Sequence, residues 1–232
     1  MKELDVFIHG ETMNLCIPTE EFARESEWYS WFNKPGVTRF LEQGMFPNTP
    51  EDQVAFFNSQ KKDRIMTIIS NKKKYIGIIS LSNIKLVKQT CEVAIVVDTS
   101  LDRKMAPYIS LEAMARISEH AFSMGINRIE AGQHIKLKGW QQRMELLGYK
   151  LEGLHKKKFT KGHEVADSVT LACHFEDFQN IISHRGALWD SKDKMESRCR
   201  QLPRESFSDM INNFFENERN NYYSKIFSLD HK

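Results

Sequence analysis

The sequence predicts a mixed α/β (α+β) protein whose central, largely antiparallel sheet is flanked by helices. Several strand-like segments come first, and a strand–helix–strand–helix–strand–strand order follows between Thr90 and Cys173. This order is typical of helices packed around one sheet. After Phe178 the composition becomes more polar, so we expect an α/β domain over residues 1–178 and a helical C-terminal extension over residues 179–232. With 41% hydrophobic residues, the 232-residue chain can bury a core.

The N-terminal elements are indicated by alternation and by turn residues. Val6–Ile17 nearly alternates apolar and polar residues, which predicts two short strands or one strand with a bulge. Asn33–Gly36 is a turn signal, and Thr49 with Pro50 marks the start of a short helix. Thr19 can cap an earlier helix, whose apolar side contains Phe22, Ala23, Trp28, Trp31 and Phe32.

The remaining elements follow from hydrophobic periodicity. The expected strands are Ile65–Ser70, Tyr75–Leu81, Thr90–Asp98, Arg128–His134, Tyr149–Lys158 and Val165–Cys173. The expected helices are Pro107–Met124 and Lys138–Leu147, each ended by a glycine, and Ser206–Phe227 in the extension. The apolar stripe of this last helix must pack somewhere: against the sheet, over a binding groove of the domain or in a homodimer.

Composition and charge exclude several classes of protein. The formal net charge is only +2, with 33 basic and 31 acidic residues, so the basic excess typical of nucleic-acid-binding proteins is absent. None of the four cysteines has the spacing of a metal site or a disulfide framework. No apolar run reaches the roughly 18 residues of a membrane span. We therefore expect a soluble, cytoplasmic protein with no metal and no nucleic-acid or membrane partner.

The unit from Cys91 to Gly153 leads to the functional prediction. In it, a buried strand passes through a short loop into helix Pro107–Met124. The free N–H groups at the start of such a helix favour an anion, and a pyrophosphate suits them. The alternative is a capped surface loop that binds no ligand.

Several motifs of this unit resemble the GNAT N-acetyltransferase superfamily. They are Glu112-Ala113, Ile129-Glu130-Ala131 and the run Met144-Glu145-Leu146-Leu147-Gly148-Tyr149-Lys150-Leu151-Glu152-Gly153. The segment Trp31–Leu41 is similar to the branch that acts on ribosomal-protein termini and sugar amines. The resemblance covers about residues 12–175 and implies the GNAT acyl-CoA acyltransferase fold, with acetyl-CoA as co-substrate.

The resemblance also implies which residues bind the coenzyme. These are Ile95, Val96, Val97, Arg103, Lys104, Met105, Ala106, Tyr108, Ile109, Ser110 and Lys138. The loop before the first helix contains no glycine, although glycine is the residue that lets a backbone approach phosphate most closely. We expect the charges of Arg103 and Lys104 and the small side chains of Ala106 and Ser110 to compensate.

Transfer of an acetyl group to an amine requires a base for the amine proton and a donor for the thioester oxygen. Glu92 and His134 are the candidate bases, with Glu42 and Tyr108 as weaker ones, and strand Val93–Val97 provides a backbone donor. The aromatic residues that either line an acceptor pocket or belong to the core are Trp28, Trp31 and Phe40.

We therefore expect an acetyl-CoA-dependent N-acetyltransferase that acts on a primary amine. The acceptor is a small molecule or a peptide: a sugar amine, a protein N-terminus or another small amine. The alternative is a catalytically silent protein, or an interaction module, with the same fold.

Overall fold

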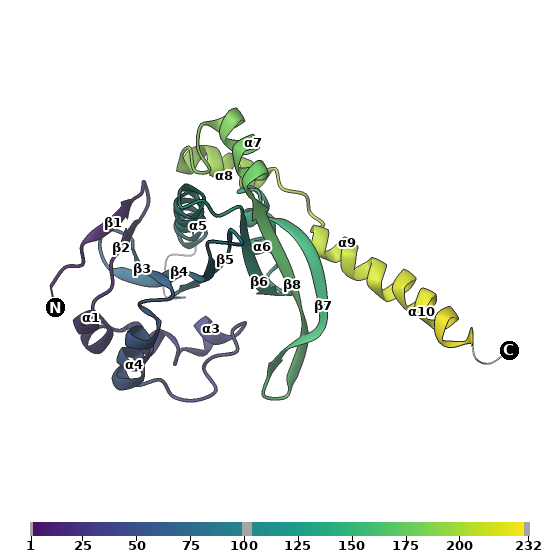
Figure 1. The fold of residues 1–232 in the computed structure, drawn as a ribbon, viewed down its shortest axis with the longest axis horizontal. Coiled ribbons are helices and arrows are strands. Elements are labelled where there is room, and N and C mark those ends of the chain that lie inside the picture. Colours follow the sequence, from purple (N-terminus) through teal and green to yellow (C-terminus); the bar gives the residue numbers. More distant parts are fainter. Residues whose placement is uncertain (1, 99–103, 230–232) are drawn as a thin grey trace.

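The computed structural model describes residues 2–98 and 104–229, which form an eight-stranded sheet with helices on both faces (Figure 1). The strand order is β1-β2-β3-β4-β5-β6-β8-β7, and every neighbouring pair is antiparallel except β5–β6. The predicted mixed, largely antiparallel sheet is thus confirmed. The strands are β1 Val6–His9, β2 Asn14–Cys16, β3 Ile65–Ser70, β4 Tyr75–Lys85, β5 Thr90–Val97, β6 Arg128–His134, β7 Lys150–Lys161 and β8 Glu164–His174.

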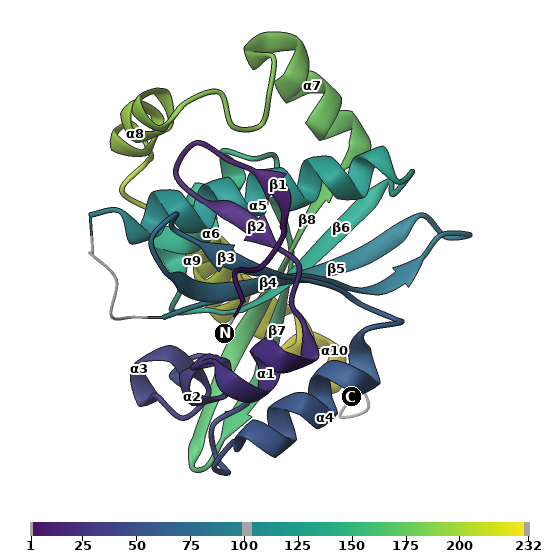
Figure 2. The same ribbon diagram turned by 90° about the vertical axis from the view of Figure 1, so that its left-hand side faces the viewer.

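The helices form one layer on each face of the sheet (Figures 1 and 2). On one face lie α5 Ala106–Ser123, α6 Lys138–Glu145, α7 Phe175–Arg185 and α8 Lys192–Arg200. On the other face lie α1 Glu20–Glu25, α2 Trp28–Trp31, α3 Pro35–Thr38 and α4 Pro50–Gln60. No helix in the described part of the chain is long and apolar enough to cross a membrane.

Each face of the sheet has its own hydrophobic core. Successive side chains of a strand point to opposite faces, so Ile68 and Ile69 of β3 belong to different cores although both are fully buried. The larger core, beneath α5, includes Leu81, Ile117 and Ile129. The smaller core, beneath α1–α4, includes Phe22, Trp28, Trp31 and Phe57. Trp28 and Trp31 are therefore core residues.

The sequence predicted a helical extension over residues 179–232 but did not place α7 and α8 in it, because residues 183–204 are polar and interrupted. Both bury few side chains. Helix α7 packs Phe178, Ile181 and Ile182 against the larger core, and α8 inserts Met195 into it. The short apolar stripes of these helices are diluted by charged residues, and for this reason periodicity alone did not indicate them.

The connection between α7 and α8 ties the extension to the domain. Leu188 and Trp189 are buried in the larger core. The indole Nε1 of Trp189 donates a hydrogen bond to Glu11 Oε2 at 2.8 Å, and the backbone N–H of Leu188 donates to Glu119 Oε1 at 3.0 Å. The extension as far as α8 thus shares the core of residues 1–178.

Glu112, one of the motif residues, also has a structural role. Its carboxylate is fully buried and accepts hydrogen bonds from the backbone N–H groups of Glu11 and Thr12 at 2.6 and 2.7 Å. The hydroxyl of Thr12 donates to it at 2.6 Å, and Arg116 lies 3.6 Å away. A buried carboxylate is stable only when it is paired in this way. Glu112 thereby fixes the β1–β2 turn to α5.

The motif from Gly148 to Gly153 stabilises the fold as well. Gly148 has a φ of +89°, and a Cβ at this position would lie 3.0 Å from Ile181. The hydroxyl groups of Tyr149 and Ser118 are hydrogen-bonded at 2.8 Å, which fixes the start of β7 to α5. Glu152 pairs with Arg128 of β6, and these hydrogen bonds lower the pKa of Glu152 to about 2.

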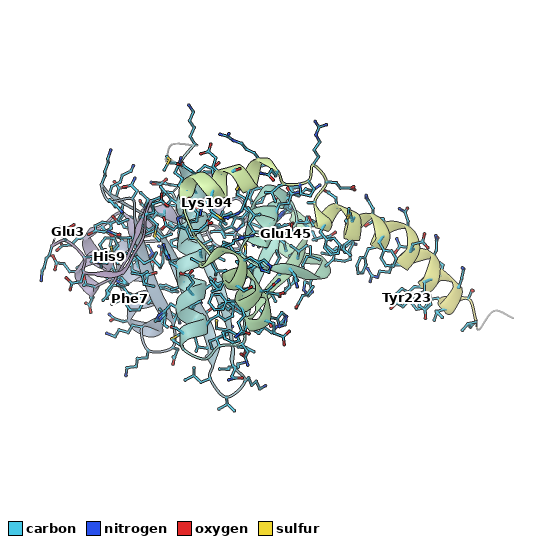
Figure 3. All side chains as sticks on the ribbon, turned by 90° about the horizontal axis from the view of Figure 1, so that it is seen from above. Glu3, Phe7, His9, Glu145, Lys194 and Tyr223 are labelled. Carbon is cyan, nitrogen blue, oxygen red and sulfur yellow. The ribbon has the colours of Figure 1, made fainter. Side chains whose placement is uncertain are left out.

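The last helical segment projects from the body of the molecule (Figures 1 and 3). It consists of α9 Phe207–Phe214, the π-helical turn Phe215–Arg219 and α10 Asn220–Phe227. Two exposed ion pairs, Lys138–Asp209 and Lys156–Glu216, connect it to α6 and β7. Its apolar stripe stays largely exposed in the single chain, with Phe214 56% and Phe227 72% accessible. A homodimer, one of the three alternatives that the sequence left open for this stripe, stays a prediction.

The two parts of the extension should differ sharply in their contribution to stability. We expect Trp189→Ala to lower the free energy of unfolding by about 3–5 kcal/mol, because it leaves a cavity in the larger core. Removing residues 206–232 should change it by only about 1–2 kcal/mol, since the exposed ion pairs contribute little. Urea unfolding followed by circular dichroism measures both. A truncation as damaging as Trp189→Ala would contradict this division.

Candidate active site

The parallel pair β5–β6 is where the sheet opens. Its ladder contains the pairs Thr90–Arg128, Cys91–Ile129 and Glu92–Glu130, and β5 and β6 are not paired beyond them. Beyond these pairs, β5 stays paired with β4 as far as Val97, whereas β6 stays paired with β8 as far as His134. The segments Val93–Val97 and Ala131–His134 therefore diverge. We call this opening the fork.

A cavity of about 1040 Å³ lies at the fork and reaches both faces of the sheet. This volume is at the upper end of the range of about 300–1000 Å³ that is typical of small-molecule sites. On the α5–α6 side its walls are mainly apolar and include Met114, Leu137, Trp140 and Met144. On the α1–α4 side they include Phe40, Gln53, Phe56, Arg64, Glu92, His134 and Ser168.

The β7–β8 hairpin closes one side of the cavity. Near its tip, the ammonium group of Lys161 donates hydrogen bonds to the carbonyl oxygens of Thr38 and Gln43 at 2.6 and 2.7 Å. These contacts hold the hairpin against the segment after α3. Phe40 of that segment and Phe159 of β7 both contact the ring of His134, with centroid distances of 4.9 and 4.6 Å.

A bulge in β7 gives the hairpin its shape. His155 pairs with Ser168 and Phe159 with Ala166, so β7 contains two more residues than β8 between these pairs. Lys157 has a φ of +56°, and its backbone N–H donates to Asp167 at 2.8 Å. Extra residues of this kind bend a strand. The bend lies just before Phe159, which lines the cavity and contacts His134.

His134 is buried, with 3% of its surface accessible. Its Nδ1 accepts a hydrogen bond from the backbone N–H of Lys136 at 3.1 Å, so the neutral ring has its proton on Nε2. Nε2 has no hydrogen-bond partner among the described residues and lies 3.7 Å from Glu164 Oε1. Burial lowers the pKa of His134, so the ring is neutral at pH 7. A neutral ring in this tautomer donates a hydrogen bond through Nε2.

Glu92 stands at the apex of the fork, exposed and lining the cavity. The opposite residue Glu130 accepts a hydrogen bond from Arg128 Nε at 2.8 Å. Glu92 itself forms no ion pair with any residue that the structure describes. Its carboxylate is therefore available to a ligand in the cavity.

The expected coenzyme-binding residues fall into two groups. Ile95 and Val96 line the cavity, and Val97 follows them on β5. Met105, Ala106, Tyr108, Ile109 and Ser110 form the start of α5, where the side chain of the N-cap residue Met105 makes no capping hydrogen bond. Ile109 is buried in the larger core, and the hydroxyl of Ser110 donates to the carbonyl of Ala106 at 2.9 Å. Lys104 is exposed, and Arg103 lies outside the described residues.

The extension lies next to this second group. Lys192 of α8 is 5.6 Å from the centre of the Tyr108 ring, and Lys138 at the start of α6 pairs with Asp209 of α9. Of the weaker candidates from the sequence, Glu42 lines the cavity with Phe40, whereas Tyr108 belongs to the start of α5. No group of three or more His, Cys, Asp or Glu residues within 2–98 and 104–229 could hold a metal ion.

Several cavity residues had no sequence signal. Gln53 lies in α4, Arg64 directly precedes β3, and Gly132 lies in the middle of β6. A Cβ built on Gly132 would meet no atom within 4 Å, so this glycine leaves part of the fork open. Of these residues, only Gly132 had a feature visible in the sequence: a glycine within a strand often marks a place where a ligand or another backbone comes close.

Several solved structures with a similar arrangement of elements are acetyltransferases by name. A protein from Chromobacterium violaceum ATCC 12472 assigned to the GNAT family is 12% identical and has a TM-score of 0.62, over 77% of this chain and 96% of that one. The chain therefore has the GNAT acetyltransferase fold. Neither the known protein families nor the curated protein sequences contain a match to it.

Two further structures contain coenzyme. RimL, a ribosomal L7/L12 α-N-protein acetyltransferase in complex with coenzyme A, is 15% identical with a TM-score of 0.64, over 75% of this chain and 99% of its own. The microcin C7 self-immunity acetyltransferase MccE, in complex with acetyl-CoA and AMP, is 19% identical with a TM-score of 0.60, over 72% and 94% of the two chains.

The tautomer and charge of His134 can be measured directly. We expect nitrogen-15 NMR to find the proton on Nε2 and a titration midpoint below the ordinary value of 6.5. Because the unfolded chain binds this proton more readily, stability should fall as the pH drops below about 6.5. The His134→Gln variant assigns the signal and should weaken this pH dependence. A proton on Nδ1 would contradict the geometry.

Proposed function

We propose that this protein is an acetyl-CoA-dependent N-acetyltransferase that acts on a primary amine by direct attack on the thioester. The observation that carries the proposal is the cavity at the fork, which joins an apolar side with Trp140 and Met144 to a polar side with Glu92. A thioester arm and an amine can meet there from opposite faces of the sheet. The fold shared with RimL and MccE, which were solved with coenzyme A and acetyl-CoA, supports this reading.

The coenzyme would follow the α5–α6 side of the fork. Its apolar arm suits Leu137, Trp140 and Met144, and its pyrophosphate suits the uncapped N–H groups at the start of α5. The edge of β5 beyond Glu92 is not paired with β6, so a backbone N–H of this edge can donate to the thioester oxygen. Lys138 could contact the coenzyme only if its ion pair with Asp209 opens.

In the reaction, the amine nitrogen bonds to the carbonyl carbon of the acetyl group and the C–S bond breaks. The nitrogen loses a proton, and we assign the role of proton acceptor to the carboxylate of Glu92. This group lines the cavity and has no ion-pair partner among the described residues. The proton then returns to the sulfur, so that coenzyme A leaves as a thiol. His134 stays a second candidate, and its tautomer favours hydrogen-bond donation over proton abstraction.

A catalytically silent protein with the same fold is the second candidate. The observation that favours it is the glycine-free start of α5, together with the engagement of Ser110 and Lys138 in contacts within the chain. The two candidates differ in one measurable respect. A silent protein would not transfer the acetyl group to any amine, whether or not it binds the coenzyme.

A charge on the apolar side of the fork should prevent coenzyme binding. We expect acetyl-CoA to bind the wild-type protein in calorimetry, and Leu137→Glu to weaken binding at least tenfold because its carboxylate enters the apolar side beside Trp140 and Met144. Gly153→Glu is the matched control, since Gly153 lies in β7 and does not line the cavity. No binding at millimolar acetyl-CoA would sink the proposal, and equal binding by Leu137→Glu would move the coenzyme elsewhere.

Removing the Glu92 carboxylate should slow transfer without affecting coenzyme affinity. We expect Glu92→Gln to lower kcat by about 100-fold or more, the usual contribution of a general base. The effect should shrink at high pH, where more of the free amine is already neutral. The measurement is the rate of acetyl transfer to a panel of amines as a function of pH. An unchanged kcat would exclude Glu92 as the base.

A further inference from the structure

Four buried groups in the cavity that can donate a hydrogen bond lack a partner within residues 2–98 and 104–229. They are Nε2 of Gln53, Nε of Arg64, Nε2 of His134 and the hydroxyl of Ser168. All four belong to the α1–α4 side, where the amine would bind. Buried polar groups are nearly always paired, so unpaired donors on one wall indicate a ligand that supplies acceptors.

The orientation of the Gln53 amide is set by its surroundings. The side chain is only 2% exposed, and its Oε1 accepts a hydrogen bond from Asn48 Nδ2 at 3.2 Å. The oxygen is therefore used, and the nitrogen remains as the free end. The adjacent residues Val54 and Phe57 belong to the smaller core, which fixes α4 on the sheet.

Arg64 adds a positive charge to the same wall. Its guanidinium carbon lies 5.8 Å from the centre of the Phe56 ring, and it forms no ion pair with a residue in the described part of the chain. In register, Ile65 pairs with Leu81 and Ser82 with Glu92, so Arg64 lies about two strand spacings, roughly 10 Å, from Glu92. A guanidinium group binds carboxylate and phosphate in a bidentate manner.

The acidic residues of the cavity do not neutralise this site. Asp52 accepts hydrogen bonds from the backbone N–H and the hydroxyl of Thr49 in the cap of α4. Glu42 and Glu92 are exposed, whereas Gln53 and His134 are buried. The accessible carboxylates of the cavity therefore suit an ammonium group, and the more deeply placed hydrogen-bond donors suit an anion.

We propose that the acceptor is an amine that also carries an anionic oxygen group, a carboxylate or a phosphate, and that Arg64 and Gln53 bind this group. The identification of the ligand as an acceptor rests on the proposed acetyl transfer. The anion site itself rests on the unpaired donors.

Matched ligands test the site without acetyl-CoA. Glucosamine 6-phosphate against glucosamine probes the phosphate, 6-aminohexanoate against hexylamine probes the carboxylate, and inorganic phosphate is the minimal anion. We expect calorimetry to give at least tenfold tighter binding for the anionic member of one pair. Equal affinity within both pairs, or no binding of any anionic probe, overturns the proposal.

Variants locate the site. Arg64→Met keeps an unbranched apolar side chain but removes the guanidinium group, so it should abolish the preference. Gln53→Glu should reduce the preference by placing a carboxylate beside the anion. Lys158→Met is the control, because Lys158 is exposed and lines the same cavity. Circular dichroism should find all three folded. A preference retained by Arg64→Met, or lost equally in Lys158→Met, overturns the proposal.

The same variants separate this inference from the proposed function. Acetyl transfer to neutral and anionic amines at equal rates would overturn the anion site and leave the acetyltransferase proposal intact. An Arg64-dependent preference in a protein that binds no acetyl-CoA would do the reverse. Arg64→Met should leave acetyl-CoA affinity unchanged, since Arg64 lies on the α1–α4 side of the fork.

Discussion

The divergence of β5 and β6 beyond Glu92 and Glu130 is the constraint on which the rest of the site depends. It persists because each strand is held by its other neighbour, β5 by β4 and β6 by β8. Gly77 makes the first of these pairings close, since a Cβ there would lie 2.4 Å from the carbonyl oxygen of Val96. Each of the two diverging strands thus keeps an antiparallel partner on its other edge. The two hydrophobic cores hold these strand pairs in place on either face of the sheet.

Much of this arrangement could be predicted from the sequence. Hydrophobic periodicity gave β3 and β6 with their observed bounds and placed α5 and α6 within two residues. The run from Gly148 to Gly153 indicated the fold because its residues are structural: a glycine with positive φ, a buried tyrosine bonded to Ser118 and a glutamate paired with Arg128. Of these requirements only the positive φ of Gly148 is local, since Tyr149 and Glu152 pair with residues 31 and 24 positions away. The run was therefore recognised through its resemblance to the family.

The walls of the cavity could not be predicted in the same way. Gln53, Arg64 and Ser168 come from distant parts of the chain and meet only through the register of the sheet and the packing of α4. A single arginine before a strand is most often a surface residue. The residues around Arg64 therefore do not distinguish it from the other arginines of the sequence. Likewise, contacts between residues far apart in the sequence help to anchor the extension, such as the hydrogen bond from Trp189 to Glu11 across 178 residues.

The polarity of the cavity follows from strand alternation. Neighbouring residues of β6 point to opposite faces, so Gln133 faces α6, where its amide contacts Met144, while His134 faces Phe40 and Phe159. A cavity that crosses the sheet therefore has two different walls, each continuous with one of the two cores. The apolar wall suits a thioester arm, and the wall with unpaired donors suits a polar acceptor. In the proposed function, the two ligands would bind on opposite faces of the sheet, and their reacting groups would meet in the gap between β5 and β6.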